Sequence, residues 1–298
     1  MLVLGIVAAV GASALYNVSI ALQALEAREV PGEHSLRLSL IGRLVRNPRW
    51  LVATVLGLLG WPLELAALLL APLTVVQPLI ASGLILLLWL GTKRLGEAPG
   101  RREAVAVAAI VAGLAGVAWA APERTTEHAG TGAMALALSL VAVPVAAPYL
   151  ARGRSSSTIG LLAVLSAGAG YAWAAIASKL LTDELALGAL LAALAWLGTV
   201  VASSVVGLLS EMSALQRRHA THVAPMMFAV QVLIPVLLAP LIFGESWGAT
   251  PLDGAALAFS MVVTLAGTML LAGSRTVGTV LESAQTASLA EPGDRLRC

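Results

Sequence analysis

Three fully ionisable side chains lie within long apolar runs of this 298-residue sequence or at their ends: Glu64, Lys179 and Glu211. A charge at the centre of a bilayer costs about 2.5–3.5 kcal/mol on insertion scales, so such residues usually face a cavity or a charged partner. A carboxylate there can bind a cation or exchange a proton. The plainer alternatives are hydrogen bonding inside the bundle for Glu64, solvation at a helix end for Glu211 and snorkelling for Lys179. A pairing of Lys179 with Glu64 is the sharper alternative for the lysine.

Prolines and amides stand near these acids. Pro62, two residues before Glu64, should kink its helix and expose backbone carbonyls that could help to hold a cation. Asn17 and Gln77 could line a path through the membrane, although interhelical hydrogen bonding is the other interpretation of such residues. Discontinuous helices at matched places are where a moving gate is expected. The prolines that should create them are Pro78, Pro225, Pro235 and Pro240.

Several other chemistries lack their residues in this sequence. His219 and His222 lie three apart, but a metal site would need more ligands than Glu211 beside them, so we assign no metal or other cofactor. The sequence has no GxxxxGK[ST] phosphate-binding loop, no HExxH and no GxSxG motif. ATP hydrolysis by the chain is thereby excluded, and a membrane-embedded enzyme is disfavoured. The single cysteine, Cys298, permits no intramolecular disulfide.

The elements that carry these residues must be membrane helices. Hydrophobic residues make up 59% and charged residues 11% of the sequence, against about 45–50% and about 25% in soluble domains, and the mean hydropathy is +0.91. The net charge of +2, without basic residues interleaved with aromatic ones, argues against nucleic-acid binding. Runs of about 20 apolar residues predict an all-α membrane protein. The nine predicted spans are 2–25, 50–70, 73–92, 104–121, 133–151, 158–181, 186–210, 221–243 and 252–274.

Basic residues in the connections predict the orientation of these spans. Sixteen fall on one side of the membrane, and only Arg124 and Lys179 on the other. Because basic residues in short loops remain cytoplasmic, the amino terminus should face outwards and the carboxy terminus the cytoplasm, in the plasma membrane. The longest connection, 26–49, contains five arginines, which exclude a span, and leucines that could form a short interfacial helix. The polar residues 275–298 should form a disordered cytoplasmic tail.

Two segments of the sequence repeat in one register. Six pairs of residues are identical at a constant offset of 147 residues: Glu64–Glu211, Ala67–Ala214, Leu68–Leu215, Thr74–Thr221, Val76–Val223 and Pro78–Pro225. Chance similarity between Ala/Leu-rich helices is the alternative. The match predicts two repeats, 1–121 and 158–274, joined by a linker helix at 133–151. An odd number of spans between matching helices would make the repeats inverted, as in many secondary transporters.

The same residues carry a resemblance to a known family. The segment 60–97 contains GWPLE, then APLTVVQP, and closes in GE. In this pattern the chain is similar to the drug/metabolite transporter (DMT) superfamily, and within it to EamA-type and NIPA-type magnesium transporters. The NIPA-type pattern has a Gly-Glu near the middle of helix 2, an Ala-Pro at its end, and a proline-led helix 3 that closes in Gly-Glu or a similar acid. The resemblance covers residues 1–274 and implies two inverted repeats, with magnesium as an alternative cargo.

The hypothesis that joins these features is a secondary transporter that moves a small solute or cation by alternating access. A membrane-embedded enzyme or an accessory membrane protein is the alternative of another class. Glu64 should be the principal carboxylate, because Glu211 is expected near cytoplasmic water. Membrane lipid is the other expected partner. Small residues repeat on some helices and should pack the bundle or, less often, a homodimer: Ala108, Ala112 and Gly116, Gly198 and Ala202, and Ser203 and Gly207.

Overall fold

The protein is described by a computed structural model in which the regular elements of the described residues are all helices. The prediction of an all-α protein is thereby confirmed. The predicted tail 275–298, Glu97 and Arg124 lie outside the described residues, as do the side chains of Gln77 and Pro78. The description covers residues 2–70, 73–96, 99–120, 131–151, 154–243, 248 and 250–272.

The chain is a succession of long helices joined by shorter connections. In order they are α1 (Leu2–Glu29), η1 (Gly32–His34), α2 (Leu38–Leu44), α3 (Pro48–Leu70), α4 (Leu73–Arg94), α5 (Arg101–Trp119), α6 (Thr131–Leu150), α7 (Ser156–Ala186), α8 (Leu190–Leu215), α9 (Ala220–Phe243), η3 (Pro251–Gly254) and α10 (Ala255–Ala272). Seven helices in the described part are long and apolar enough to cross a membrane, which is the architecture of a multi-pass membrane protein. α3 and α4 are also long, at 23 and 22 residues, and the total of nine spans stays a prediction.

Some helices extend beyond the predicted spans. α7 runs to Ala186 rather than to residue 181, and α8 runs to Leu215 rather than to residue 210. Hydropathy marks where a chain leaves the apolar layer, whereas a helix continues for as long as its backbone hydrogen bonds are made. Glu211 therefore lies inside α8, four residues before its end.

Prolines do not interrupt these helices. α3 continues through Pro62. α9 is one continuous helix although it contains Pro225, Pro235 and Pro240, so the prediction that this helix is broken is wrong. Each proline removes only one backbone N–H from the helical ladder. Neighbouring helices and local adjustments can satisfy the group that is freed, so a membrane helix can continue through proline.

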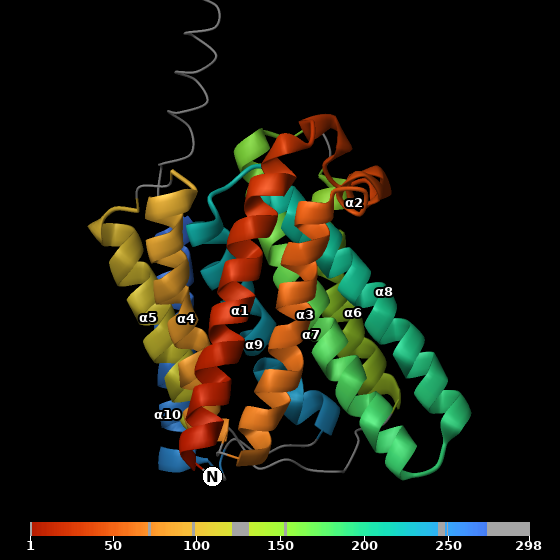
Figure 1. Cartoon of the computed structure of the whole chain (residues 1–298). Helices are drawn as coiled ribbons and strands as arrows, with labels where there is room; N and C mark the ends of the chain where they lie inside the picture. The colour runs from red at the N-terminus through yellow and green to blue at the C-terminus, as the bar shows by residue number, and fades with distance from the viewer. Residues whose placement is uncertain are drawn as a thin grey trace, which may run out of the picture.

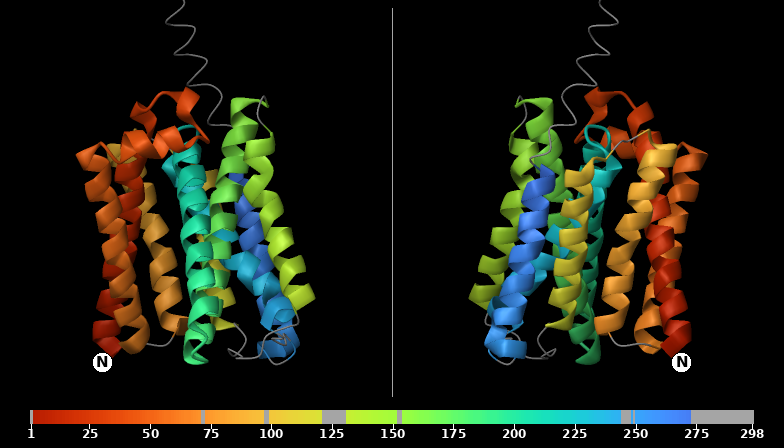
Figure 2. Two further views of the ribbon diagram at one scale, coloured as in Figure 1. Left: turned by 90° about the vertical axis from the view of Figure 1, so that its right-hand side faces the viewer. Right: turned by 90° about the vertical axis from the view of Figure 1, so that its left-hand side faces the viewer.

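The helices stand side by side in one bundle (Figure 1). α1 packs against α3 and α4, and α7 packs against α8 and α9. α6 lies against α7, and α5 packs along α10. Figure 2 shows that the connection between α1 and α3 crosses one end of the bundle, opposite the end at which the chain begins. Two helices, α1 and α7, therefore each pack against the next two long helices of the chain.

α5 and α10 cross at short range through glycines. A Cβ atom at Gly113 of α5 would lie 2.7 Å from the backbone nitrogen of Thr264. A Cβ atom at Gly267 of α10 would lie 3.0 Å from the backbone nitrogen of Ile110. Gly267 follows Gly113 by 154 residues, and the same number separates the two partners. The glycine is thus on α5 in one contact and on α10 in the other, at positions related by the same 154 residues. Because Ile110 faces Gly267 and Gly113 faces Thr264, α5 and α10 run antiparallel.

Small residues also bring α7 and α8 together. A Cβ atom at Gly170 would lie 2.9 Å from the Cα of Gly207 and 3.2 Å from the carbonyl oxygen of Ser203. The predicted packing role of Ser203 and Gly207 inside the bundle is thereby confirmed. Four other predicted small-residue positions are exposed in the described protein and do not pack its interior: Ala108, Ala112, Gly198 and Ala202.

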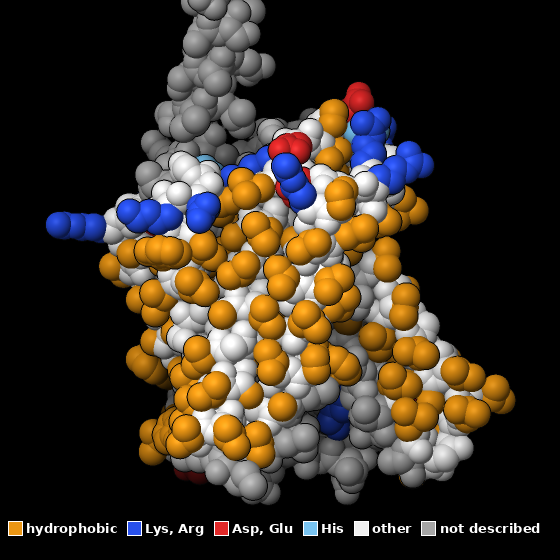
Figure 3. Space-filling view, in the orientation of Figure 1, with side chains coloured by type: hydrophobic (Ala, Val, Ile, Leu, Met, Phe, Trp, Pro, Cys, Tyr) orange, Lys and Arg blue, Asp and Glu red, His pale blue; other side chains and the backbone are white. Residues whose placement is uncertain are grey.

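Basic side chains gather at one end of the bundle, and apolar side chains cover its sides (Figure 3). An apolar belt of this kind suits contact with lipid tails. We call the end where the basic residues gather the Arg-rich end. It holds the starts of α3, α5 and α7 and the ends of α1, α4 and α8. Its exposed basic residues are Arg37, Arg43, Arg46, Arg49, Lys93, Arg94, Arg101, Arg102 and Arg154.

We call residues 30–47, which join α1 to α3 across the Arg-rich end, the strap. The strap contains η1 and α2. The predicted short helix is present as α2, and its Leu40 and Leu44 are fully buried. Because these two leucines share one face of α2 and are removed from solvent, the body of the bundle holds the strap by an apolar face.

Candidate functional site: two tyrosine–glutamate pairs

Glu64 is bound by a tyrosine of the neighbouring helix. The Tyr16 O–H on α1 donates a hydrogen bond to Glu64 Oε2 on α3 at 2.7 Å. One turn earlier on α3, a Cβ atom at Gly60 would lie only 2.6 Å from Tyr16 Cε1. The absence of a side chain at this glycine lets the aromatic ring approach α3 closely. The first candidate site is therefore a unit of three residues: a glycine, a tyrosine and the acid that the tyrosine binds.

Glu211 is bound in the same way on the other side of the bundle. The Tyr171 O–H on α7 donates a hydrogen bond to Glu211 Oε2 on α8 at 2.6 Å. One turn earlier on α8, a Cβ atom at Gly207 would lie 3.1 Å from Tyr171 Cε1. Gly207 and Glu211 follow the glycine and acid of the first unit by the same 147 residues, and the tyrosines are 155 residues apart. The unit of glycine, tyrosine and glutamate thus occurs twice.

A close contact through a glycine also occurs once on each side of the bundle. The glycine lies on α4 in the first contact and on α7 in the second. A Cβ atom at Gly83 of α4 would lie 3.1 Å from the carbonyl oxygen of Ser13 on α1. A Cβ atom at Gly168 of α7 would lie 2.6 Å from the Cβ of Val230 on α9. Val230 follows Gly83 by 147 residues, and Gly168 follows Ser13 by 155. The offsets that relate the two acids and the two tyrosines therefore also relate the packing of α1 on α4 to that of α7 on α9.

The two acids lie towards opposite ends of the bundle. Glu64 is six residues before the end of α3, about 9 Å along the axis at 1.5 Å per residue. Glu211 is four residues before the end of α8, about 6 Å. α3 begins at the Arg-rich end and α8 finishes there (Figure 1). Glu211 is therefore near the Arg-rich end, and Glu64 is in the far half.

The surroundings of the two acids differ in burial. Glu64 is half-buried, whereas Glu211 is only 4% exposed. The expectation that Glu211 is a solvated acid at a helix end is wrong for two physical reasons. α8 continues past it to Leu215, and residues 209–215 are all buried. The strap lies over this end of α8 and removes it from solvent.

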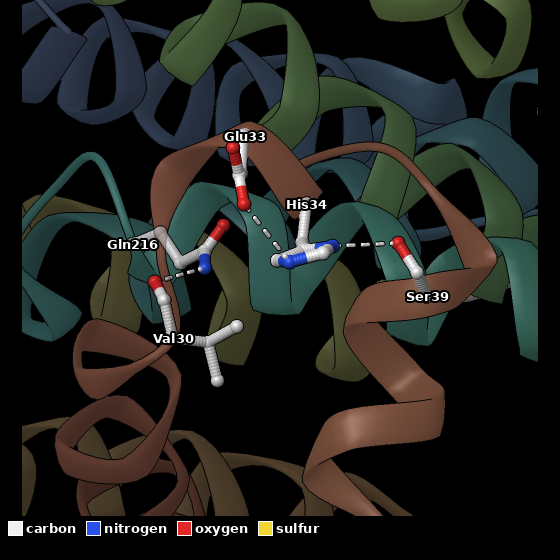
Figure 4. Close-up of polar contacts among 5 residues, drawn as sticks. All are labelled: Val30, Glu33, His34, Ser39 and Gln216. Carbon is white, nitrogen blue, oxygen red and sulfur yellow. Dashed lines mark hydrogen bonds and ion pairs between the residues drawn. The ribbon is translucent and has the colours of Figure 1, made fainter.

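Hydrogen bonds tie the strap to the end of α8 and to the turn that follows it. The Leu36 N–H donates to Ser213 Oγ at 2.8 Å. Gln216 Nε2 donates to the Val30 carbonyl oxygen at 3.0 Å (Figure 4). The strap is ordered within itself near this point, where His34 Nδ1 lies 2.8 Å from Ser39 Oγ (Figure 4). Residues from the first part of the chain thus close the end of the helix that carries Glu211.

Two arginines in the turn after α8 belong to the same closure. Arg217 Nε donates to Ser35 Oγ of the strap at 3.1 Å, and Arg218 donates to the Ser157 carbonyl oxygen at 3.1 Å. Burial lowers the pKa of the Arg217 and Arg218 guanidinium groups from their ordinary value. Arginine nevertheless stays protonated at neutral pH. The turn therefore keeps two positive charges that hold the strap and the start of α7 in place.

A cluster of hydroxyl groups, which sequence reasoning missed, begins one residue away from Glu211. Ser210 Oγ is 2.9 Å from Tyr149 of α6 and 2.9 Å from Ser166 of α7. Ser166 Oγ also donates to the Val145 carbonyl oxygen at 2.8 Å. Single serines are common in apolar helices and commonly bond their own backbone, so nothing in the sequence distinguishes these. Three helices, α6, α7 and α8, are joined beside the acid.

The remaining predicted site residues are dispersed. Asn17 is 1% exposed and donates to the Ser13 carbonyl oxygen at 2.8 Å, while its own Oδ1 is buried without a hydrogen-bond partner among the described residues. Lys179 is half-buried on α7, and its pairing with Glu64 stays a prediction. Pro62 is exposed and Pro225 buried. The path-lining role of Asn17 also stays a prediction, supported by its unsatisfied oxygen.

Metal ligands do not gather in the part of the chain that the structure describes, where no three His, Cys, Asp or Glu residues lie together. The rings of His219 and His222 are 5.8 Å apart. Comparison of the chain with protein-family models, with curated proteins and with solved structures finds no match. No relative therefore indicates what the two tyrosine–glutamate pairs do, and their chemistry is inferred from the tyrosines and glutamates themselves.

Proposed function

We propose that the protein is a secondary membrane transporter of the drug/metabolite type that moves a small solute or cation by alternating access. Its two halves would be α1–α5 and α7–α10, inverted with respect to each other and joined by α6. The observation that carries the proposal is the unit of glycine, tyrosine and glutamate, which is built twice with its acids towards opposite ends of the bundle. Inverted repeats that move against each other are the usual basis of alternating access in secondary transporters.

The proposed inversion is supported by contacts that repeat between the halves. The Tyr–Glu bonds and the glycine contacts of α1 with α4 and of α7 with α9 share the offsets 147 and 155. The antiparallel crossing of α5 with α10 exchanges Gly113 and Gly267. An exchange of this kind is expected where a two-fold axis in the membrane plane passes between matching helices.

The proposed chemistry rests on a carboxylate that has a neutral partner. A phenol O–H donates a hydrogen bond to the acid without neutralising its charge. An unpaired charge is costly in the membrane interior. Each acid should therefore take up a proton or a cationic group while its own end is open to water, and hold it while that end is closed.

The cargo follows from the number of ligands at each end. Among the described residues, each unit supplies one carboxylate and one phenol, and the acids are too far apart along the bundle to act together. This arrangement suits a proton or a singly charged organic cation better than magnesium, because one carboxylate balances only half the charge of a divalent ion. A NIPA-like magnesium transporter is the alternative that the resemblance of residues 60–97 keeps open.

The orientation in the membrane is part of the proposal. The Arg-rich end would face the cytoplasm, because basic residues in short connections are retained there. Glu211 would then serve the cytoplasmic gate and Glu64 the outer gate. The amino terminus would lie outside the plasma membrane.

The test is flux into proteoliposomes that contain the purified full chain and a trapped pH indicator or magnesium indicator. Solutes of different charge are supplied outside with an imposed pH gradient. Glu64→Gln and Glu211→Gln keep shape and hydrogen bonding but remove the charge, and each should abolish coupled flux. Glu184→Gln, which removes an acid of α7 outside the two units, is the matched control. Wild-type flux in both Glu64→Gln and Glu211→Gln would refute the proposal, and magnesium flux alone would select the NIPA-like alternative.

A further inference from the structure

The outward side of α2 is apolar, although α2 lies among arginines. Successive residues of an α-helix are about 100° apart around its axis. Leu40 and Leu44 point into the bundle and are buried. Leu38 and Val45 lie about 20° from each other on another side, and they are 70% and 47% exposed. Two large apolar side chains are thus presented away from the protein at the same place.

A basic strip lies next to this apolar one. Arg43 lies about 140° around α2 from Leu38, Arg46 stands in the turn directly after α2, and both arginines are exposed. Arg37 directly precedes α2, Arg49 lies in the first turn of α3, and both are also exposed. None of the four makes a side-chain hydrogen bond or ion pair with a described residue, in contrast to Arg217 of the neighbouring turn. Their charges are therefore available to a partner outside the chain.

The level of this surface in the bundle indicates the partner. The basic band of Figure 3 begins directly where the apolar belt ends, and α2 lies at that end of the bundle (Figure 1). A membrane presents acyl chains and, just above them, phosphate groups. Apolar residues beside arginines at this boundary are the pattern of helices that lie in the membrane interface. Clusters of four or more basic residues close to a membrane helix attract anionic lipids.

We propose that the strap is a binding site for anionic phospholipids, with Leu38 and Val45 among the acyl chains and Arg43 and Arg46 on the phosphate groups. This role is independent of transport. It gives the exposed leucine and valine an apolar partner and the arginines a negative one. The strap is also bonded to the end of α8 through Leu36, so a bound lipid would hold the closure over that helix.

Native mass spectrometry of the full chain in detergent, titrated with phosphatidylglycerol or phosphatidylcholine, tests the proposal. Wild-type protein should bind phosphatidylglycerol more tightly. In Arg43→Gln/Arg46→Gln this affinity should fall about 25-fold, at about fivefold for each arginine near the membrane surface. Arg101→Gln/Arg102→Gln removes the same charge from the same end, but on α5, which lies apart from α2 (Figure 1), and should weaken binding less. An equal loss of affinity in the two double variants would show only a general electrostatic attraction of the lipid to the Arg-rich end, and would overturn the proposal.

Two further arms distinguish a lipid site from a site for free anions. Leu38→Ser/Val45→Ser should weaken phosphatidylglycerol binding although it leaves every charge in place. Inorganic phosphate should displace the lipid no better than chloride at equal ionic strength; better displacement would indicate a free-anion site and overturn the proposal. Arg43→Lys/Arg46→Lys should retain most of the affinity, and it replaces the glutamine pair if that variant does not fold. Wild-type affinity in a folded Arg43→Gln/Arg46→Gln protein would also overturn the proposal.

Discussion

Tyr171 donates a hydrogen bond to Glu211 at 2.6 Å, deep in the protein although the acid lies only four residues from the end of α8. The matching bond from Tyr16 reaches Glu64, which is half-buried. One chemical contact is thus used at two levels of solvent exposure. Because an unsatisfied polar group costs more in the interior than near water, the two pairs should respond differently to the same substitution.

Removing the phenol oxygen should destabilise the second pair more than the first. Tyr171→Phe should lower the free energy of unfolding by about 1.5–3 kcal/mol, the range for a hydrogen bond to a charged group. Tyr16→Phe should lower it by about 0.5–1 kcal/mol, because water can replace the lost donor. Denaturant unfolding in detergent micelles measures both. In Tyr171→Phe/Glu211→Gln, the Glu211→Gln change should cost less stability than it does alone. Equal losses of stability in Tyr171→Phe and Tyr16→Phe would contradict the difference in burial.

The glycines that face the tyrosines should not accept a methyl group. Gly60→Ala places a Cβ atom 2.6 Å from Tyr16 Cε1 and should destabilise the protein by about 1–3 kcal/mol through overpacking. Gly207→Ala, at 3.1 Å from its ring, should cost less. Gly198→Ala on α8 is the control, since nothing lies within 4 Å of its Cβ position. It should be neutral or stabilising by up to about 1 kcal/mol, because alanine is the better helix former.

Thermal unfolding of the three alanine variants gives the order directly. The expected order of melting temperature is Gly198→Ala highest, then Gly207→Ala, then Gly60→Ala. A Gly60→Ala protein as stable as Gly198→Ala would mean that the ring of Tyr16 does not pack against α3.

The strap should control access of water to the end of α8. Ser213→Ala removes the acceptor of the Leu36 N–H and leaves a buried donor unsatisfied, at a cost of about 1–3 kcal/mol. Amide hydrogen exchange in residues 209–216 should then be at least about fivefold faster. Ser39→Ala removes an exposed hydroxyl of the same strap and should leave exchange there unchanged. Equal exchange rates in Ser213→Ala and the wild type would show that the strap is not what keeps water from Glu211.

Labelling from one side of the membrane tests the proposed orientation. With Cys298 replaced by serine, a cysteine at Leu187, which is 77% exposed between α7 and α8, should react with an impermeant thiol reagent added to intact cells. A cysteine at Ser155, at the Arg-rich end, should react only after the cells are opened. Labelling of the Ser155 position from outside would reverse the orientation and exchange the gates assigned to the two acids.

Much of the fold could be predicted because it depends on local composition. Membrane helices follow from long apolar runs, since each helix satisfies its own backbone and the lipid selects apolar side chains. The short helix of the strap follows from leucines spaced among arginines. The offset of 147 residues indicated that Glu64 and Glu211 occupy matching positions, because rare residue types stand out against an Ala/Leu-rich background. These features need no knowledge of which helix touches which.

The partners of the two acids required the tertiary structure. Tyr16 and Tyr171 meet their acids across 48 and 40 residues of chain, and hydropathy carries no information on which helix faces bring such residues together. The prolines of α9 likewise predicted a break that the helix does not have, because the surroundings of a helix decide whether a lost hydrogen bond interrupts it.

The sequence by itself determined an all-helical membrane chain, its basic connections and the offset that relates two glutamates, since these depend on residue types and their spacing. Only the tertiary structure decided that each glutamate has a tyrosine donor and a facing glycine, and that Glu211 is buried while Glu64 is partly exposed. The physical reason is that burial belongs to the whole packed molecule. A residue near a helix end meets water unless another segment covers it, and the segment that covers Glu211 comes from a strap more than 160 residues earlier in the chain.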